Sequence, residues 1–256
     1  MLLSAVVSGT HQGRCRFIAL SAILLAACSG ESTPNVPTVR DANEARAAAR
    51  EAAGNKPADQ ATPTLNRAAK VPSDPKLLVP SSELERLRAA LLTLDAQSDA
   101  KEARDVCFEV TGAIARTISI EYSRLRKAGK QPYLVMHPAR ASWDLTASAH
   151  AGIDIDGLEG LFGNEGENIR LMPEAFELFA MPDWADAFRD AMAIWPSDKP
   201  FHTWPVPLTD EQKKAFAACE ERMHEAVRRS PKQDPFEVRP RYAVEHPEIF
   251  FVTSRP

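Results

Sequence analysis

Apolar residues recur at helical spacing from about residue 84 onward. Four leucines fall on one face of the first predicted helix, and Ser82 stands three residues before Glu85, as in a capping box. A second, longer helix is predicted over residues 100–128, where one apolar stripe runs to Gly129, a residue suited to end a helix. The leucines of the first face are Leu84, Leu87, Leu91 and Leu94.

The sequence patterns of the remaining segments also predict helices. A third helix is predicted over residues 138–149, followed by a turn at Gly152. Further helices are expected after Pro173 and Pro182, after Thr209 with Gln212 three residues on as a capping box, and over residues 236–245. No stretch alternates apolar and polar residues as a strand does. The sequence therefore predicts an all-α domain of about six to eight helices.

The segment before this domain has a different composition. Residues 29–75 contain six prolines, a single leucine and no aromatic residue. Such a segment buries too little apolar surface to offset the entropy of ordering. The predicted organisation is a signal peptide at 1–27, a disordered tether at 28–75 and a helical domain at 76–256.

A short apolar run lies near the start of the chain. Phe17 to Ala27 are eleven residues without a charge, preceded by Arg14 and Arg16. A helix needs about 20 apolar residues to cross a bilayer core. The run is therefore too short to span a membrane and is typical of a signal peptide.

The residues that end this run resemble the lipobox of bacterial lipoproteins. They read Leu25-Ala26-Ala27-Cys28. The resemblance implies that Cys28 becomes the lipidated N-terminus, and several acyl chains together anchor a protein stably. Ser29 after the cysteine favours the periplasmic face of the outer membrane. The alternatives are a secretory signal with a chance cysteine, or a buried helix.

Charge is mild overall but uneven. The chain carries a net charge of −4, yet residues 144–190 hold eleven acidic residues and two arginines. Such a block repels nucleic acid and attracts a basic protein. The alternative is an ordinary solvated surface with carboxylates at helix N-termini. The predicted partner-binding residues are Asp154, Asp156, Glu159, Glu165, Glu167, Glu174, Glu177, Asp183, Asp186 and Asp190.

Cysteine and histidine spacing indicates no metal site. Cys107 and Cys219 stand at apolar positions of predicted helices, without a Cys-x-x-Cys pair. Either they form one disulfide in an oxidising compartment, or both are buried free thiols. No nucleophile, phosphate-binding or dinucleotide motif occurs either, so we predict no metal, no cofactor and no catalytic residue. An enzyme assembled from distant residues stays open as an alternative.

Residues 145–251 contain a series of glycine, aromatic and proline landmarks. They are a Gly157–Phe162 turn and helix, helices at 174–180 and 184–194, Trp195-Pro196, and His246-Pro247 before Phe250. In this order the segment resembles the C-terminal domain of the nineteen-kilodalton DNA-mimic protein family. The resemblance implies a small helical fold and a homodimer. It also implies an acidic inhibitor that occupies the DNA-binding face of a cytoplasmic repressor.

This chain departs from the family pattern. Ile155-Asp156-Gly157 stands where the family has Asn-Gly-Gly, and Leu161 replaces an aromatic residue. DNA mimicry also requires the cytoplasm, which conflicts with the signal peptide. The sequence therefore favours a lipid-anchored envelope protein whose acidic domain binds an unknown protein, with DNA mimicry as the alternative.

Overall fold

The computed structural model of this protein describes residues 63–203 and 205–252. All of these residues belong to one compact unit. Cys28, most of the predicted tether and Trp204 lie outside the described residues.

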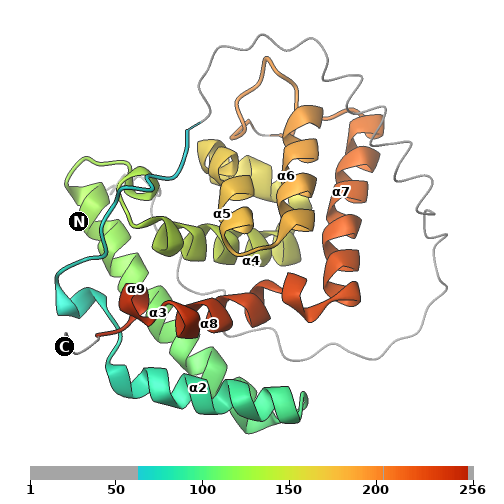
Figure 1. Cartoon of the computed structure of the whole chain (residues 1–256). Helices are drawn as coiled ribbons and strands as arrows, with labels where there is room; N and C mark the ends of the chain where they lie inside the picture. Colours follow the sequence, from blue (N-terminus) through green and yellow to red (C-terminus); the bar gives the residue numbers. More distant parts are fainter. Residues whose placement is uncertain (1–62, 204, 253–256) are drawn as a thin grey trace, which may run out of the picture. The chain divides into compact units, whose positions relative to one another are not determined.

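Helices make up the described unit (Figure 1). Its residues form no strand and a single isolated bridge, between Val79 and Phe251, so the predicted all-α fold is confirmed. The α-helices are α2 (Ser81–Ala96), α3 (Lys101–Lys127), α4 (Pro138–Glu165), α5 (Met172–Leu178), α6 (Pro182–Ile194), α7 (Asp210–Arg229), α8 (Pro235–Glu245) and α9 (Pro247–Phe250). Short 3₁₀ helices are η2 (Pro75–Leu77), η3 (Pro132–Leu134), η4 (Gly166–Leu171) and η5 (Pro231–Gln233).

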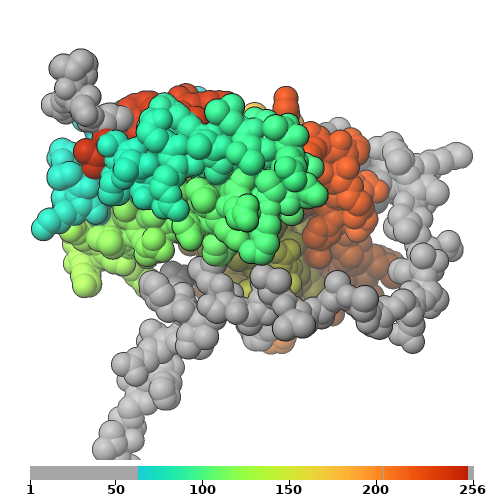
Figure 2. Space-filling model, turned by 90° about the horizontal axis from the view of Figure 1, so that it is seen from below, coloured from blue at the N-terminus to red at the C-terminus, as the bar shows by residue number. Residues whose placement is uncertain are grey.

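Helices α2 and α3 pack together and form much of the face seen in Figure 2. The predicted leucine face of α2 is buried, whereas Leu92 and Phe108 on these two helices are exposed. The predicted capping box is wrong: α2 starts at Ser81 and no side chain caps it. Val79 is paired with the C-terminal segment, so the chain enters the helix directly after Pro80.

The third predicted helix is much longer than expected. α4 continues through Gly152, where a side-chain Cβ would lie 2.6 Å from Leu161 Cδ1. Gly152 therefore allows close packing rather than a turn. The break comes at Gly157 instead, whose φ of +68° is in the left-handed region that glycine tolerates. Beyond it, Glu220 of α7 accepts a hydrogen bond from the Leu158 N–H at 2.8 Å.

Helix α4 packs with α5 and α7, and these two helices pack with α6, around a group of aromatic side chains. Phe162 is fully buried, and its ring centroid lies 5.0 Å from that of Phe216 and 5.5 Å from that of Phe201. Phe176 stacks on Trp184 at 5.1 Å. Aromatic rings bury large areas and favour tilted or offset contacts, so this cluster is the main source of packing in the half of the unit that carries the acidic block.

Described residues before the predicted domain boundary at residue 76 already pack against the helical unit. Leu65 is 3% exposed, and its backbone N–H donates to Glu174 at 2.8 Å. Residues 63–75 therefore belong to the folded unit. The tether prediction fails there because Leu65, the only leucine of that segment, reaches the core.

Candidate functional site

The structure spreads the predicted acidic residues over α4, η4, α5 and α6. Six of the ten form ion pairs with arginines: Glu167 with Arg170, Glu174 with Arg67, Glu177 and Asp186 with Arg189, Asp183 with Arg229, and Asp190 with Arg222. Three of these five arginines come from other elements or segments, namely Arg67, Arg222 and Arg229, whereas Arg170 and Arg189 each pair with a carboxylate three residues away. The chain itself therefore neutralises much of the block that sequence reasoning treated as one face.

The remaining four carboxylates all lie on α4. Glu165 accepts from Ser148 at 3.2 Å, and one oxygen of Glu159 is buried without a hydrogen-bond partner. Asp154 and Asp156 are exposed, and neither forms an ion pair with a lysine or arginine among the described residues. Between them Ile155 is 57% exposed. Consecutive helical residues project about 100° apart, so Asp154 and Asp156 lie on opposite sides of α4 and Ile155 remains exposed on its surface.

An aromatic side chain from another helix lies close to this segment. Phe236 near the start of α8 is 54% exposed, and its ring meets the His150 ring edge-on at 4.6 Å. His150 Nδ1 is also 3.4 Å from an Asp154 carboxylate oxygen. Histidine therefore links the ring of Phe236 to the acidic end of α4. We call these residues the Phe236 surface: Phe236, His150 and Asp154.

Two basic side chains, His150 and Arg239, contact the Phe236 ring. Burial lowers the pKa of His150, against the attraction of the Asp154 carboxylate, so His150 is neutral at neutral pH. Burial also lowers the pKa of Arg239 to about 10, with Asp234 and Asp144 opposing the change. The Arg239 guanidinium lies 5.5 Å from the centre of the Phe236 ring, within cation–π range. The ring is thus held between His150 and Arg239 while its outer part faces solvent.

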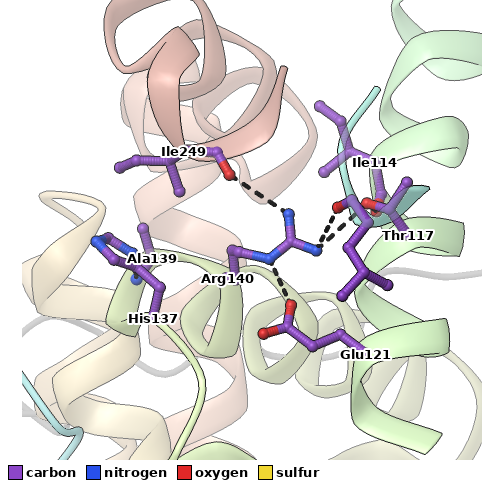
Figure 3. A network of polar contacts seen from close by, with 8 residues as sticks. Ile114, Thr117, Glu121, His137, Ala139, Arg140 and Ile249 are labelled. Carbon is purple, nitrogen blue, oxygen red and sulfur yellow. Dashed lines mark hydrogen bonds and ion pairs between the residues drawn. The ribbon is translucent and has the colours of Figure 1, made fainter. Parts of the chain in front are cut away.

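A second polar cluster lies at the other end of α4 and is buried (Figure 3). Arg140, fully buried, donates to Glu121 of α3 at 2.6 Å and to the Leu77 carbonyl at 2.9 Å. It reaches toward the Ile249 carbonyl at 3.4 Å. One guanidinium thereby joins α3, α4, the segment before α2 and α9. The cluster is enclosed and internally satisfied, so its role is to hold the fold.

Both described cysteines are buried free thiols, which is the second of the two sequence alternatives. The disulfide between Cys107 on α3 and Cys219 on α7 is not formed in this structure. Burial raises the pKa of Cys107 to about 11, which keeps this thiol protonated and unreactive at neutral pH.

Within residues 63–203 and 205–252, no three histidine, cysteine or acidic side chains gather as metal ligands do. The same residues include no helix that is both long and apolar enough to cross a membrane.

The chain was compared with protein families, curated proteins and solved structures. No family model, no curated protein and no solved structure matches the chain. The resemblance to the DNA-mimic family therefore stays a prediction.

Sequence reasoning missed two residues of the Phe236 surface. Phe236 was expected only as the start of a helix, and no role was predicted for His150. Their contact joins positions 86 residues apart, on α4 and α8. The one signal in the sequence was a histidine four residues before an aspartate, the spacing of neighbours on a helix.

Proposed function

We propose that this protein is a lipid-anchored protein of the bacterial cell envelope whose helical domain binds another protein. The observation that carries the anchor is Leu25-Ala26-Ala27-Cys28, which ends an apolar run behind two arginines. Acylation of the Cys28 thiol and its new α-amino group supplies several hydrocarbon chains, and two or more such chains hold a protein at a membrane stably. Ser29 favours the outer membrane, with the domain in the periplasm.

Binding is supported by the Phe236 surface, because aromatic side chains dominate the energetics of protein interfaces. The six arginine-paired carboxylates give DNA mimicry no comparable support, since a mimic of DNA phosphates needs carboxylates free of cations. We therefore place the binding function at the acidic end of α4 rather than over the whole predicted block.

The anchor is tested by growing cells with radiolabelled palmitate. Wild type and Cys15→Ala are expected to take up label and to sediment with membranes. Cys28→Ala is expected to lose the label, because no other thiol follows the apolar run directly.

Cys15 is the matched control, since it lies in the same signal segment but before the apolar run. An unlabelled wild-type protein, or equal labelling of wild type and Cys28→Ala, contradicts the anchor. Density separation of inner and outer membranes then tests the location that Ser29 favours, and recovery with the inner membrane contradicts that part.

A further inference from the structure

The second half of α3 carries exposed cations and no exposed carboxylate. From Arg116 to Lys127 its one carboxylate is that of Glu121, which is buried. Arg116 and Lys127 are both exposed, and neither forms an ion pair with a described residue. In the first half of the helix, by contrast, Lys101 is paired with Asp105 at 2.7 Å. The surface of the second half is therefore positively charged.

An exposed apolar side chain lies among these cations. Ile120 is 45% exposed. Residues four apart on a helix are neighbours on its surface, so Arg116 and Arg124 flank Ile120 along α3. Lys127, seven residues after Ile120, lies on the same side of the helix about two turns further on. One side of α3 thus presents an isoleucine between basic residues.

The chain enters the helical unit beside this side of α3. In the segment before α2, Asp74 accepts a hydrogen bond from Arg124 at 2.6 Å and one from the backbone N–H of Lys76 at 2.9 Å. Lys76 is exposed, so it adds a cation close to Arg124. We call the following residues the α3 basic face: Lys76, Arg116, Ile120, Arg124 and Lys127.

The proposed lipid anchor lies a short length of chain before this face. Residues 29–62 separate Cys28 from the first described residue. A flexible linker of that length has an r.m.s. end-to-end distance of about 30–35 Å. Contact between the tethered domain and its own bilayer is then an intramolecular event at high effective concentration, for which a weak attraction is sufficient.

We propose that the α3 basic face docks on the bilayer that holds the lipid anchor, with its cations against anionic phospholipid headgroups and Ile120 at the headgroup–acyl boundary. The inference rests on the proposed function, because the anchor supplies the bilayer. Each lysine or arginine close to an anionic membrane strengthens binding about fivefold. Docking holds the domain in one orientation and uses no residue of the Phe236 surface.

The end of a helix does not by itself account for this face. Cations in the last turn favour the helix dipole, which explains Arg124 and Lys127. It explains neither Arg116 in the middle of α3 nor the exposure of Ile120.

Nucleic-acid phosphates would also attract a basic face. Lipid is favoured over nucleic acid for two reasons. The anchor keeps a bilayer within reach, and an exposed isoleucine adds to binding at a lipid interface but not to binding of phosphates.

The test uses the full lipidated chain in nanodiscs with a trace of lipid that carries a nitroxide at its headgroup. One set contains phosphatidylcholine alone, and the other contains equal parts of phosphatidylcholine and phosphatidylglycerol. A fluorophore is attached at Ser123→Cys, an exposed position three residues from Ile120. The control position is Ser98→Cys, exposed before the other end of α3 and more than about 30 Å away along the helix.

We expect the nitroxide to quench the probe at position 123 at least about threefold more strongly than the probe at position 98 when phosphatidylglycerol is present. In phosphatidylcholine alone the two probes should be quenched equally. High salt should remove the difference, because it screens exposed charges.

Matched charge variants locate the docking. Arg116→Gln with Lys127→Gln is expected to lower the ratio of docked to undocked domain about tenfold or more. Lys213→Gln with Lys214→Gln removes the same charge from exposed positions in the first turn of α7 and is the control, with an expected change below about twofold.

An apolar pair of variants tests the role of Ile120. Ile120→Ser should lower the ratio of docked to undocked domain about threefold or more, since it removes the side chain that enters the interface. Leu92→Ser on α2, where the leucine is 71% exposed, should leave the ratio unchanged.

Equal quenching of the two probes in phosphatidylglycerol, or equal losses in the two double charge variants, overturns the inference. A DNA duplex that changes the fluorescence at position 123 more than phosphatidylglycerol does would assign the face to nucleic acid and overturn it as well. Failure of palmitate labelling contradicts the anchor, whereas an acylated protein whose probe at position 123 is not quenched contradicts the docking alone. The two proposals are thereby distinguished.

Discussion

Helix α4 carries charged groups near both ends, and the fold treats them in opposite ways. Near its start Arg140 is fully buried and bonded to Glu121 and to backbone carbonyls from distant segments. Fourteen and sixteen residues later, Asp154 and Asp156 are exposed without a lysine or arginine partner in the described part of the chain. The first end is internally satisfied and serves the fold. The second end leaves charge and apolar surface for another molecule.

The largest expected effect is on the buried end. Arg140→Ala removes one member of a buried ion pair and leaves Glu121 and the Leu77 carbonyl without their donors. Breaking such a pair typically costs about 3–5 kcal/mol. We expect urea unfolding to show a loss of this size in the free energy of unfolding. A loss below about 1 kcal/mol would mean that Arg140 does not hold these segments together.

The kink at Gly157, directly after Asp156, should respond less. Glu220→Ala removes the carboxylate that caps Leu158 after Gly157, and a lost cap costs about 1 kcal/mol. Glu220→Gln keeps an acceptor oxygen and is the control with the smaller loss. Chemical denaturation of both variants checks this order, and equal losses would show that the negative charge rather than the acceptor matters.

Lowering the pH should reduce the free energy of unfolding through His150, a residue of the Phe236 surface. Because burial lowers the pKa of His150 below its ordinary 6.5 in the folded protein, the unfolded chain binds more protons once the pH falls below that value. Stability is therefore full above pH 6.5 and declines as the pH falls toward the folded pKa. Burial lowers the pKa of His137 as well. The free energy of unfolding should therefore still fall as the pH is lowered when only one of the two histidines is replaced.

His150→Gln should flatten this decline in a series of urea titrations between pH 7 and pH 5. An unchanged slope in His150→Gln would show that this histidine does not take up a proton on unfolding.

The smallest expected effect on stability is at the outward end. Phe236→Ala removes a ring that is about half exposed and lies outside the core, and most surface substitutions change stability within about 0.5 kcal/mol. Thermal unfolding checks this expectation. A loss above about 2 kcal/mol would assign Phe236 to the fold and remove the contrast between the two ends of α4.

Local sequence signals predicted the helices well where one segment decided the outcome. Thr209 and Gln212 form the expected capping box at the start of α7. The leucine spacing of α2 identified its buried face, although the pairing of Val79 with the C-terminal segment moved its start. Such a pairing is between distant segments, and no local pattern contains it.

The roles of the glycines in α4 also depend on residues that are distant in the sequence. The sequence placed the turn at Gly152, and the structure breaks the helix at Gly157. Which glycine packs closely and which turns depends on Leu161 and on Glu220 from α7. The acidic residues are close together in the sequence, but the arginines that pair with six of them come partly from α7 and from the segment before α2.

The central claim is that the outward end of α4 binds a protein partner, and photocrosslinking in intact cells tests it most directly. A benzoyl-phenylalanine probe placed at position 236 should give a discrete adduct with another protein. The same probe at position 108 should not give that adduct. No protein adduct at position 236, or the same adduct from both positions, would contradict the account.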